Sequence, residues 1–173
     1  MQQSEELDMK ANITLAGIAL AAAICIAPAS VLGSEPGSTI KTITGDFDEV
    51  FGDLQDAVIN RGLVIDYVGD VGKMLERTAE AAKGSDARVP YLNARYLQFC
   101  SAALTHQATD ADVHNLAMCP YVVFAYQTRA EPGRVSVGYR QIQLAPAAAS
   151  QAAQAKVHGL LEAVVNDAVG ANP

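Results

Sequence analysis

Residues 119–139 read CPYVVFAYQTRAEPGRVSVGY, and they carry the strongest structural signal in the chain. Residues 121–126 form an apolar run of β-branched and aromatic side chains, which predicts a central strand. A turn at Glu131-Pro132-Gly133 leads into residues 135–139, a second short segment rich in valine. Two such segments joined by a turn that contains Pro and Gly predict a β-hairpin in the second half of the chain.

Upstream of this hairpin, the pattern predicts a strand, a helix and a second strand. Residues 39–44 alternate and are β-branched, which is typical of a strand. Asp46 and Glu49 then form a capping-box pattern at the start of a helix. The apolar face of that helix comprises Phe47, Val50, Phe51, Leu54 and Val58. Asn60-Arg61-Gly62 ends the helix before the second strand, expected over residues 63–68.

The remaining segments supply three more helices and one more strand. Asp70 caps a helix that ends near Gly84, and the third strand is expected over residues 96–100. Residues 101–118 are helical with a break at Thr109 or Asp110. The last helix begins at Pro146. Its apolar stripe comprises Val157, Leu160, Leu161, Val164, Val165 and Ala168.

These elements predict an α+β fold. It has a mainly antiparallel sheet of about five strands, and the helices pack chiefly on one face of the sheet. The chain has 173 residues, of which 50% are hydrophobic and 18% charged, so it is long enough for one globular domain and excludes a disordered protein. Its net charge of −7, with no run of Lys or Arg, argues against a nucleic-acid partner.

The N-terminal segment predicts export. Residues 13–32 are almost wholly apolar, follow Lys10 and contain Ala27-Pro28-Ala29-Ser30, a pattern typical of a secretory signal cleaved after Ala29. Twenty apolar residues also just span a bilayer, so an uncleaved signal anchor that holds the protein at the membrane is the alternative. Acidic residues before Lys10 are unusual in a signal, and they favour translation from Met9 over Met1.

The predicted domain organisation follows from this segment. Residues 1–29 are a signal peptide or signal anchor, residues 30–38 are a linker, and residues 39–170 form a single α+β domain. The protein is expected in the periplasm or outside the cell. Two cysteines, Cys100 and Cys119, remain after the signal is removed, and an oxidising compartment favours a disulfide between them.

Other side chains near this cysteine pair leave two alternatives open. His106, His114 and Met118 lie between Cys100 and Cys119, and thiolate, imidazole and thioether groups are ligands for copper or zinc. A redox-active dithiol is the other alternative. Neither a CxxC nor an HxxxH spacing occurs, so a structural disulfide, with both histidines at the surface, is the favoured interpretation.

The sequence contains no recognised catalytic motif. There is no GxSxG, no P-loop and no GxGxxG. Five tyrosines fall in predicted strands, where they either line a pocket or fill a sheet face, and packing is the favoured interpretation: Tyr67, Tyr96, Tyr121, Tyr126 and Tyr139. His158 lies beside the apolar stripe of the last helix and is expected to be solvated.

The hairpin also resembles a known family. A Pro that introduces the central strand, followed by a turn and the Val-rich residues 135–139 ending in Tyr, is similar to the domain of unknown function 302 family. The acid-capped helix and residues 60–64 (NRGLV) extend the resemblance over about residues 39–140. Many members have a Gly-Asn-Pro turn where this chain has Phe99-Cys100-Ser101-Ala102, so the cysteine pair indicates an exported branch. The resemblance implies a small α+β domain that self-associates as a homodimer, and it implies no reaction.

The functional prediction follows from these parts together. The protein is expected to be a periplasmic, disulfide-stabilised and non-catalytic binding or accessory protein of the cell envelope, with a small ligand or an envelope protein as its partner. The alternative is a metal- or redox-active protein that handles copper, zinc or haem through Cys100, His106, His114, Met118 and Cys119.

Overall fold

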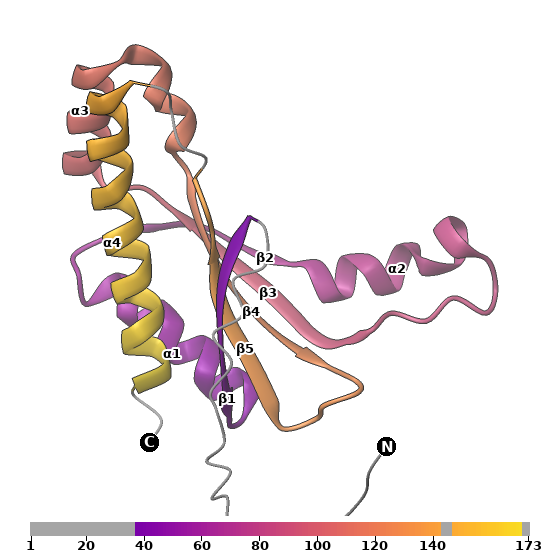
Figure 1. Ribbon diagram of the computed structural model, residues 1–173. Helices are drawn as coiled ribbons and strands as arrows, with labels where there is room; N and C mark the ends of the chain where they lie inside the picture. Colours follow the sequence, from indigo (N-terminus) through magenta and orange to yellow (C-terminus); the bar gives the residue numbers. More distant parts are fainter. Residues whose placement is uncertain (1–36, 143–146, 171–173) are drawn as a thin grey trace, which may run out of the picture. The chain divides into compact units, whose positions relative to one another are not determined.

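The structure is a computed structural model that describes residues 37–142 and 147–170, all of which belong to one compact unit. The predicted signal segment, most of the linker and Pro146 lie outside the described residues. Along the chain the elements are β1 (Ser38–Thr44), α1 (Phe47–Ile59), β2 (Ile65–Asp70), α2 (Val71–Lys83), β3 (Tyr91–Phe99), α3 (Ala102–Ala111), the 3-10 helix η1 (Val113–Met118), β4 (Tyr121–Thr128), β5 (Arg134–Arg140) and α4 (Ala148–Gly170) (Figure 1).

The five strands form one antiparallel sheet in the order β1-β5-β4-β3-β2. This arrangement confirms the predicted fold class, the hairpin between β4 and β5, and the central position of β4. The third strand is longer than predicted, because it begins at Tyr91 and not at residue 96. Asn93 and Arg95 interrupt the apolar pattern in its first half, and the sequence therefore marked only its second half as a strand.

One face of the sheet carries the hydrophobic core. α1 and α4 pack against each other and against this face, and Figure 1 shows both on the same side of the sheet. Every residue of the predicted apolar face of α1 is 3% exposed or less. The stripe on α4 is also buried, except for the half-buried Leu160. Asp46 caps α1 as predicted, since its carboxylate accepts hydrogen bonds from the backbone N–H groups of Asp48 and Glu49.

The other face of the sheet is mostly uncovered, and we call it the open face. Among the described elements only α2 packs on it, through β3, and Gly72 is the one residue of α2 that is buried. In Figure 1, α2 extends away from the sheet on the side opposite α1 and α4. The prediction that helices pack chiefly on one face is confirmed. No helix within the described residues is long and apolar enough to cross a membrane.

The helical segment between β3 and β4 breaks later than predicted. α3 ends at Ala111 and η1 starts at Val113, so the break lies at Asp112 and not at Thr109 or Asp110. The Asp112 carboxylate accepts a hydrogen bond from the backbone N–H of His114, which caps the new helical turn. Thr109 instead donates its hydroxyl hydrogen to the carbonyl of Thr105 and stays within α3.

Candidate functional site

The predicted disulfide is present in the structure. Cys100 follows β3 and Cys119 precedes β4, and the two residues are bonded, with their Cα atoms 5.8 Å apart. The bond closes a segment with a sequence separation of 19 residues that contains α3 and η1. With both sulfur atoms in the disulfide, neither cysteine offers a thiolate as a nucleophile or metal ligand in this state.

The structure also places the residues of the predicted metal cluster. His106 on α3 and His114 on η1 are exposed, whereas Met118 is 7% exposed and belongs to the hydrophobic core. Across residues 37–142 and 147–170, no three His, Cys, Asp or Glu side chains are grouped so that they could hold a metal ion. The metal-handling alternative therefore stays a prediction and receives no geometric support in the described part of the chain.

His158 differs from its prediction. Its side chain is half-buried and not solvated, because its ring packs edge-on against Tyr139 at 6.0 Å between centroids. The Nε2 atom lies 3.2 Å from the backbone nitrogen and 3.1 Å from the carbonyl oxygen of Ile142. His158 therefore ties α4 to the segment that follows β5.

The tyrosines of the strands divide between the two faces of the sheet. Tyr121 and Tyr139 lie in the core, and burial raises the pKa of the Tyr121 phenol, an effect that the nearby Thr105 side chain opposes more weakly. Tyr96 and Tyr126 lie on the open face, where they line a hollow. Packing was therefore the right prediction for the first pair and the wrong one for the second.

The open face carries a cluster of aromatic side chains. Tyr67 and Tyr96 are 5.9 Å apart between ring centroids, Phe124 and Tyr126 are 6.3 Å apart, and Tyr126 is 5.7 Å from Tyr91. Successive side chains of a strand alternate between the faces of a sheet, so the even-numbered residues of β4 all project to this side. The cluster is half-exposed, because only α2 covers this face.

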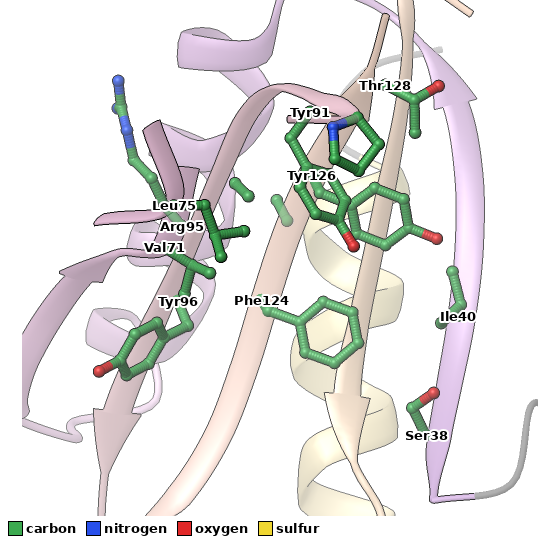
Figure 2. Close-up of a pocket in the computed structure, with 13 residues that line it drawn as sticks. Ser38, Ile40, Val71, Leu75, Tyr91, Arg95, Tyr96, Phe124, Tyr126 and Thr128 are labelled. Carbon is green, nitrogen blue, oxygen red and sulfur yellow. The ribbon is translucent and has the colours of Figure 1, made fainter. Parts of the chain in front are cut away.

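A hollow opens between Tyr96 on β3 and Phe124 on β4, although these two residues are direct partners in the strand register. Each ring lies over a glycine on the next strand outward. A Cβ atom at Gly69 on β2 would lie 2.7 Å from the Tyr96 hydroxyl, and a Cβ atom at Gly138 on β5 would lie 2.9 Å from Cζ of Phe124. Figure 2 shows the two rings directed to opposite sides. The glycines therefore create the space into which the rings turn, and the gap between the rings forms the floor of the hollow.

The hollow continues along the strands in two connected parts. The first part has a volume of about 620 Å³, and its walls include Val71 and Leu75 from α2 and Ile40 from β1. The second part, of about 350 Å³, shares four lining residues with the first: Ser38, Val71, Tyr96 and Phe124. Together the two parts fall within the size range of small-molecule sites, which are concave and mostly apolar.

The described residues that line the hollow are mainly apolar and aromatic. No His, Cys, Asp or Glu is among those described lining residues in either part. Arg95 contributes to the lining, but its guanidinium lies on the core side of the sheet, 2.8 Å from the Asp48 carboxylate and 5.2 Å from the centroid of the Phe47 ring. The lining hydroxyl groups of Ser38 and Thr128 have no general base beside them in the hollow.

Sequence reasoning missed most of this site. It placed the candidate site at the cysteine pair, and it did not single out Tyr91, Phe124 or either glycine. The feature that marks the hollow is an aromatic residue on one strand paired with a glycine on the next strand. Such a pair is recognised only when the strand register is known, and a single sequence does not provide the register. The protein is a small α+β domain with a hollow on the open face of its sheet.

Comparison with known proteins identifies the family. The sequence model of the family described as "Domain of unknown function DUF302" matches residues 39–168, so the chain belongs to this family. No curated protein matches the sequence. The crystal structure of an uncharacterized conserved DUF302 protein from Bacillus stearothermophilus has a TM-score of 0.62 against this structure at 12% sequence identity, and the match covers 76% of this chain and 97% of that chain. At this identity the similarity shows a shared fold.

Proposed function

We propose that this protein is an exported, non-catalytic binding protein of the cell envelope, and that it holds a small molecule with an apolar body in the hollow on its open face. The observation that carries the proposal is the hollow itself, with aromatic side chains on its floor and no His, Cys, Asp or Glu among the described residues that line it. An exposed apolar concavity of this kind is the default binding site of a soluble domain.

Two features support the export part of the proposal. The disulfide between Cys100 and Cys119 matches an oxidising compartment, because such bonds are rare in the reducing cytosol. Residues 13–32 have the composition of a secretory signal, with Ala27-Pro28-Ala29-Ser30 as the cleavage region.

Intact mass spectrometry of the protein expressed from its full sequence tests export directly. We expect a mature chain that begins at Ser30 and is about 2 Da lighter than its reduced form, since one disulfide removes two hydrogen atoms. A chain that keeps residues 9–29 and reaches the membrane fraction would support the signal-anchor alternative. A reduced protein in the cytosolic fraction, or a mass that includes bound copper, zinc or haem, would contradict the proposal.

A neutral fluorescent probe tests the hollow. N-phenyl-1-naphthylamine fluoresces more strongly in apolar surroundings, and the chain has no tryptophan to interfere with its signal. We expect saturable binding that falls at least about tenfold in Phe124→Asp, because a carboxylate in an apolar site pays a desolvation cost of a few kcal/mol. Phe124→Ala, which adds no charge, is the second variant and is expected to weaken binding less.

Leu116→Asp is the matched control for this experiment. Leu116 lies on η1, 62% exposed and away from the hollow, and the substitution adds the same charge at another exposed apolar position. We expect it to bind the probe as the wild type does. Circular dichroism confirms that each variant is folded. Equal loss of binding in Phe124→Asp and Leu116→Asp, or no saturable binding by the wild type, would contradict the proposed function.

A further inference from the structure

The hollow has two chemically different ends. Its first part runs beside Tyr126 and Thr128 on β4 and is aromatic and aliphatic. Its second part reaches Val122 and ends between Gln98 on β3 and Arg140 on β5. Arg140 pairs with Ser38 of β1 in the strand register, so this residue lies at the end of the hollow near the start of the described chain.

Arg140 is available to a ligand. It is exposed, and neither its guanidinium nor the Gln98 amide has a hydrogen bond or ion pair with another side chain in the described part of the protein. Two other cations near the open face are engaged: Arg129 contacts Glu76 at 3.2 Å, and Lys73 contacts Asp70 at 3.5 Å. No acidic side chain is among the described residues that line the hollow, so none of those residues neutralises the charge of Arg140.

The length of the hollow fits one extended chain. It follows β4 from Val122 to Thr128, and six steps of about 3.4 Å each give a length of about 20 Å. Carbon–carbon bonds of about 1.5 Å arranged in a zigzag place a chain of a dozen carbons within that length.

We propose that the hollow binds a long-chain fatty acid. The carboxylate accepts hydrogen bonds from the Arg140 guanidinium and the Gln98 amide, and the hydrocarbon chain lies between Tyr96 and Phe124 and runs toward Tyr126. Arginine is well suited to this role because its planar fork of N–H donors matches the two oxygens of a carboxylate. This inference rests on the proposed binding function and adds the charge and shape of the ligand.

Three ligands that share a twelve-carbon chain test the inference by competition with the fluorescent probe at pH 8, below the concentrations at which they form micelles. They are dodecanoate, 1-dodecanol and dodecylamine. For the wild type we expect dodecanoate to bind about tenfold or more tightly than dodecanol, because a hydrogen bond to a charged group contributes about 1.5–3 kcal/mol. Dodecylamine is expected to bind most weakly, since its ammonium group approaches Arg140.

Arg140→Gln is the informative variant, and Arg134→Gln is its matched control. Arg134 lies on the same strand and the same face as Arg140, is also exposed, and pairs with Thr44 at the opposite end of β5, outside the lining of the hollow. We expect Arg140→Gln to reduce the affinity for dodecanoate to that for dodecanol. Arg134→Gln is expected to bind all three ligands as the wild type does.

The outcomes separate this inference from the proposed function. Equal affinities of the wild type for dodecanoate and dodecanol, or equal effects of the two arginine substitutions, would overturn the fatty-acid inference and leave the binding function standing. Failure of all three ligands to displace the probe would also overturn it. Sedimentation at rising protein concentration covers one more outcome: a dimer whose formation abolishes probe binding would show that a second copy fills the hollow, and this would overturn both proposals.

Discussion

Gly138→Ala is expected to lower the free energy of unfolding by about 2–3 kcal/mol. An added Cβ atom would overlap the carbonyl oxygen of Thr39 and would lie 2.9 Å from Cζ of Phe124 and 3.1 Å from Cγ1 of Ile40. The Thr39 oxygen belongs to the backbone of β1, so the contact is relieved only if the strand shifts away from β5. Urea unfolding monitored by circular dichroism measures the loss.

Two other glycines serve as controls for this substitution. At Gly69 the three atoms nearest to the added Cβ all belong to Tyr96, whose side chain can turn back toward the hollow, so Gly69→Ala is expected to cost less than Gly138→Ala. At Gly159 on α4 a Cβ atom has nothing within 4 Å, and alanine in a helix is expected to stabilise by about 0.5–1 kcal/mol. A Gly138→Ala protein as stable as the wild type would contradict the close approach of β1, β5 and the Phe124 ring.

Removal of the disulfide is expected to lower the free energy of unfolding by about 3 kcal/mol. The bond between Cys100 and Cys119 closes a loop with a sequence separation of 19 residues, and without it the unfolded chain gains conformational entropy. The double variant Cys100→Ala/Cys119→Ala, compared with the wild type in urea, measures this contribution.

Reduction of the wild type is the matched test of the disulfide. Dithiothreitol is expected to lower the stability of the wild type toward that of the double variant and to leave the double variant unchanged. If the bond only stabilises the fold, the double variant still binds the apolar probe in the hollow under conditions where it is folded. A wild type whose stability does not respond to complete reduction would contradict a stabilising role for the bond.

Much of the fold could be predicted because local patterns and tertiary structure agree. The hairpin of β4 and β5 has apolar strands around a turn with Gly133, and that glycine adopts a positive φ of 89°. α1 has both a capping residue, Asp46, and a continuous apolar face that the core buries completely. Where the two levels agree in this way, one sequence is sufficient to assign the element.

The course of α2 shows where local patterns are insufficient. Val71, Met74, Leu75 and Thr78 lie at helical spacing, and this periodicity alone indicates a helix that packs through their shared face. Val71 and Leu75 form a wall of the hollow, whereas Met74 is exposed. The periodicity identified the helix and its apolar residues, but whether such a face packs into a core or lines a groove depends on what lies opposite it.

The sequence pointed to a different candidate site, the region of the cysteine pair, for a similar reason, and that site stays a prediction. Residue type favoured the region of His106 and His114, because thiols and imidazoles are the most recognisable reactive groups in this chain. The hollow is lined mainly by strand residues that carry no distinctive chemistry. It arises from the strand register, in which Phe124 pairs with Gly138 on β5 and with Tyr96 on β3. Neither pairing can be read from a single sequence.

A titration of the ¹⁵N-labelled protein with dodecanoate, followed by amide chemical shifts, tests directly whether the open face is the binding surface of this protein. We expect saturable shifts concentrated at the open-face strands and the start of α2, including Ala94, Gln98, Phe124 and Val71. Shifts concentrated between Cys100 and Cys119, or no saturable shifts at all, would contradict binding at the open face.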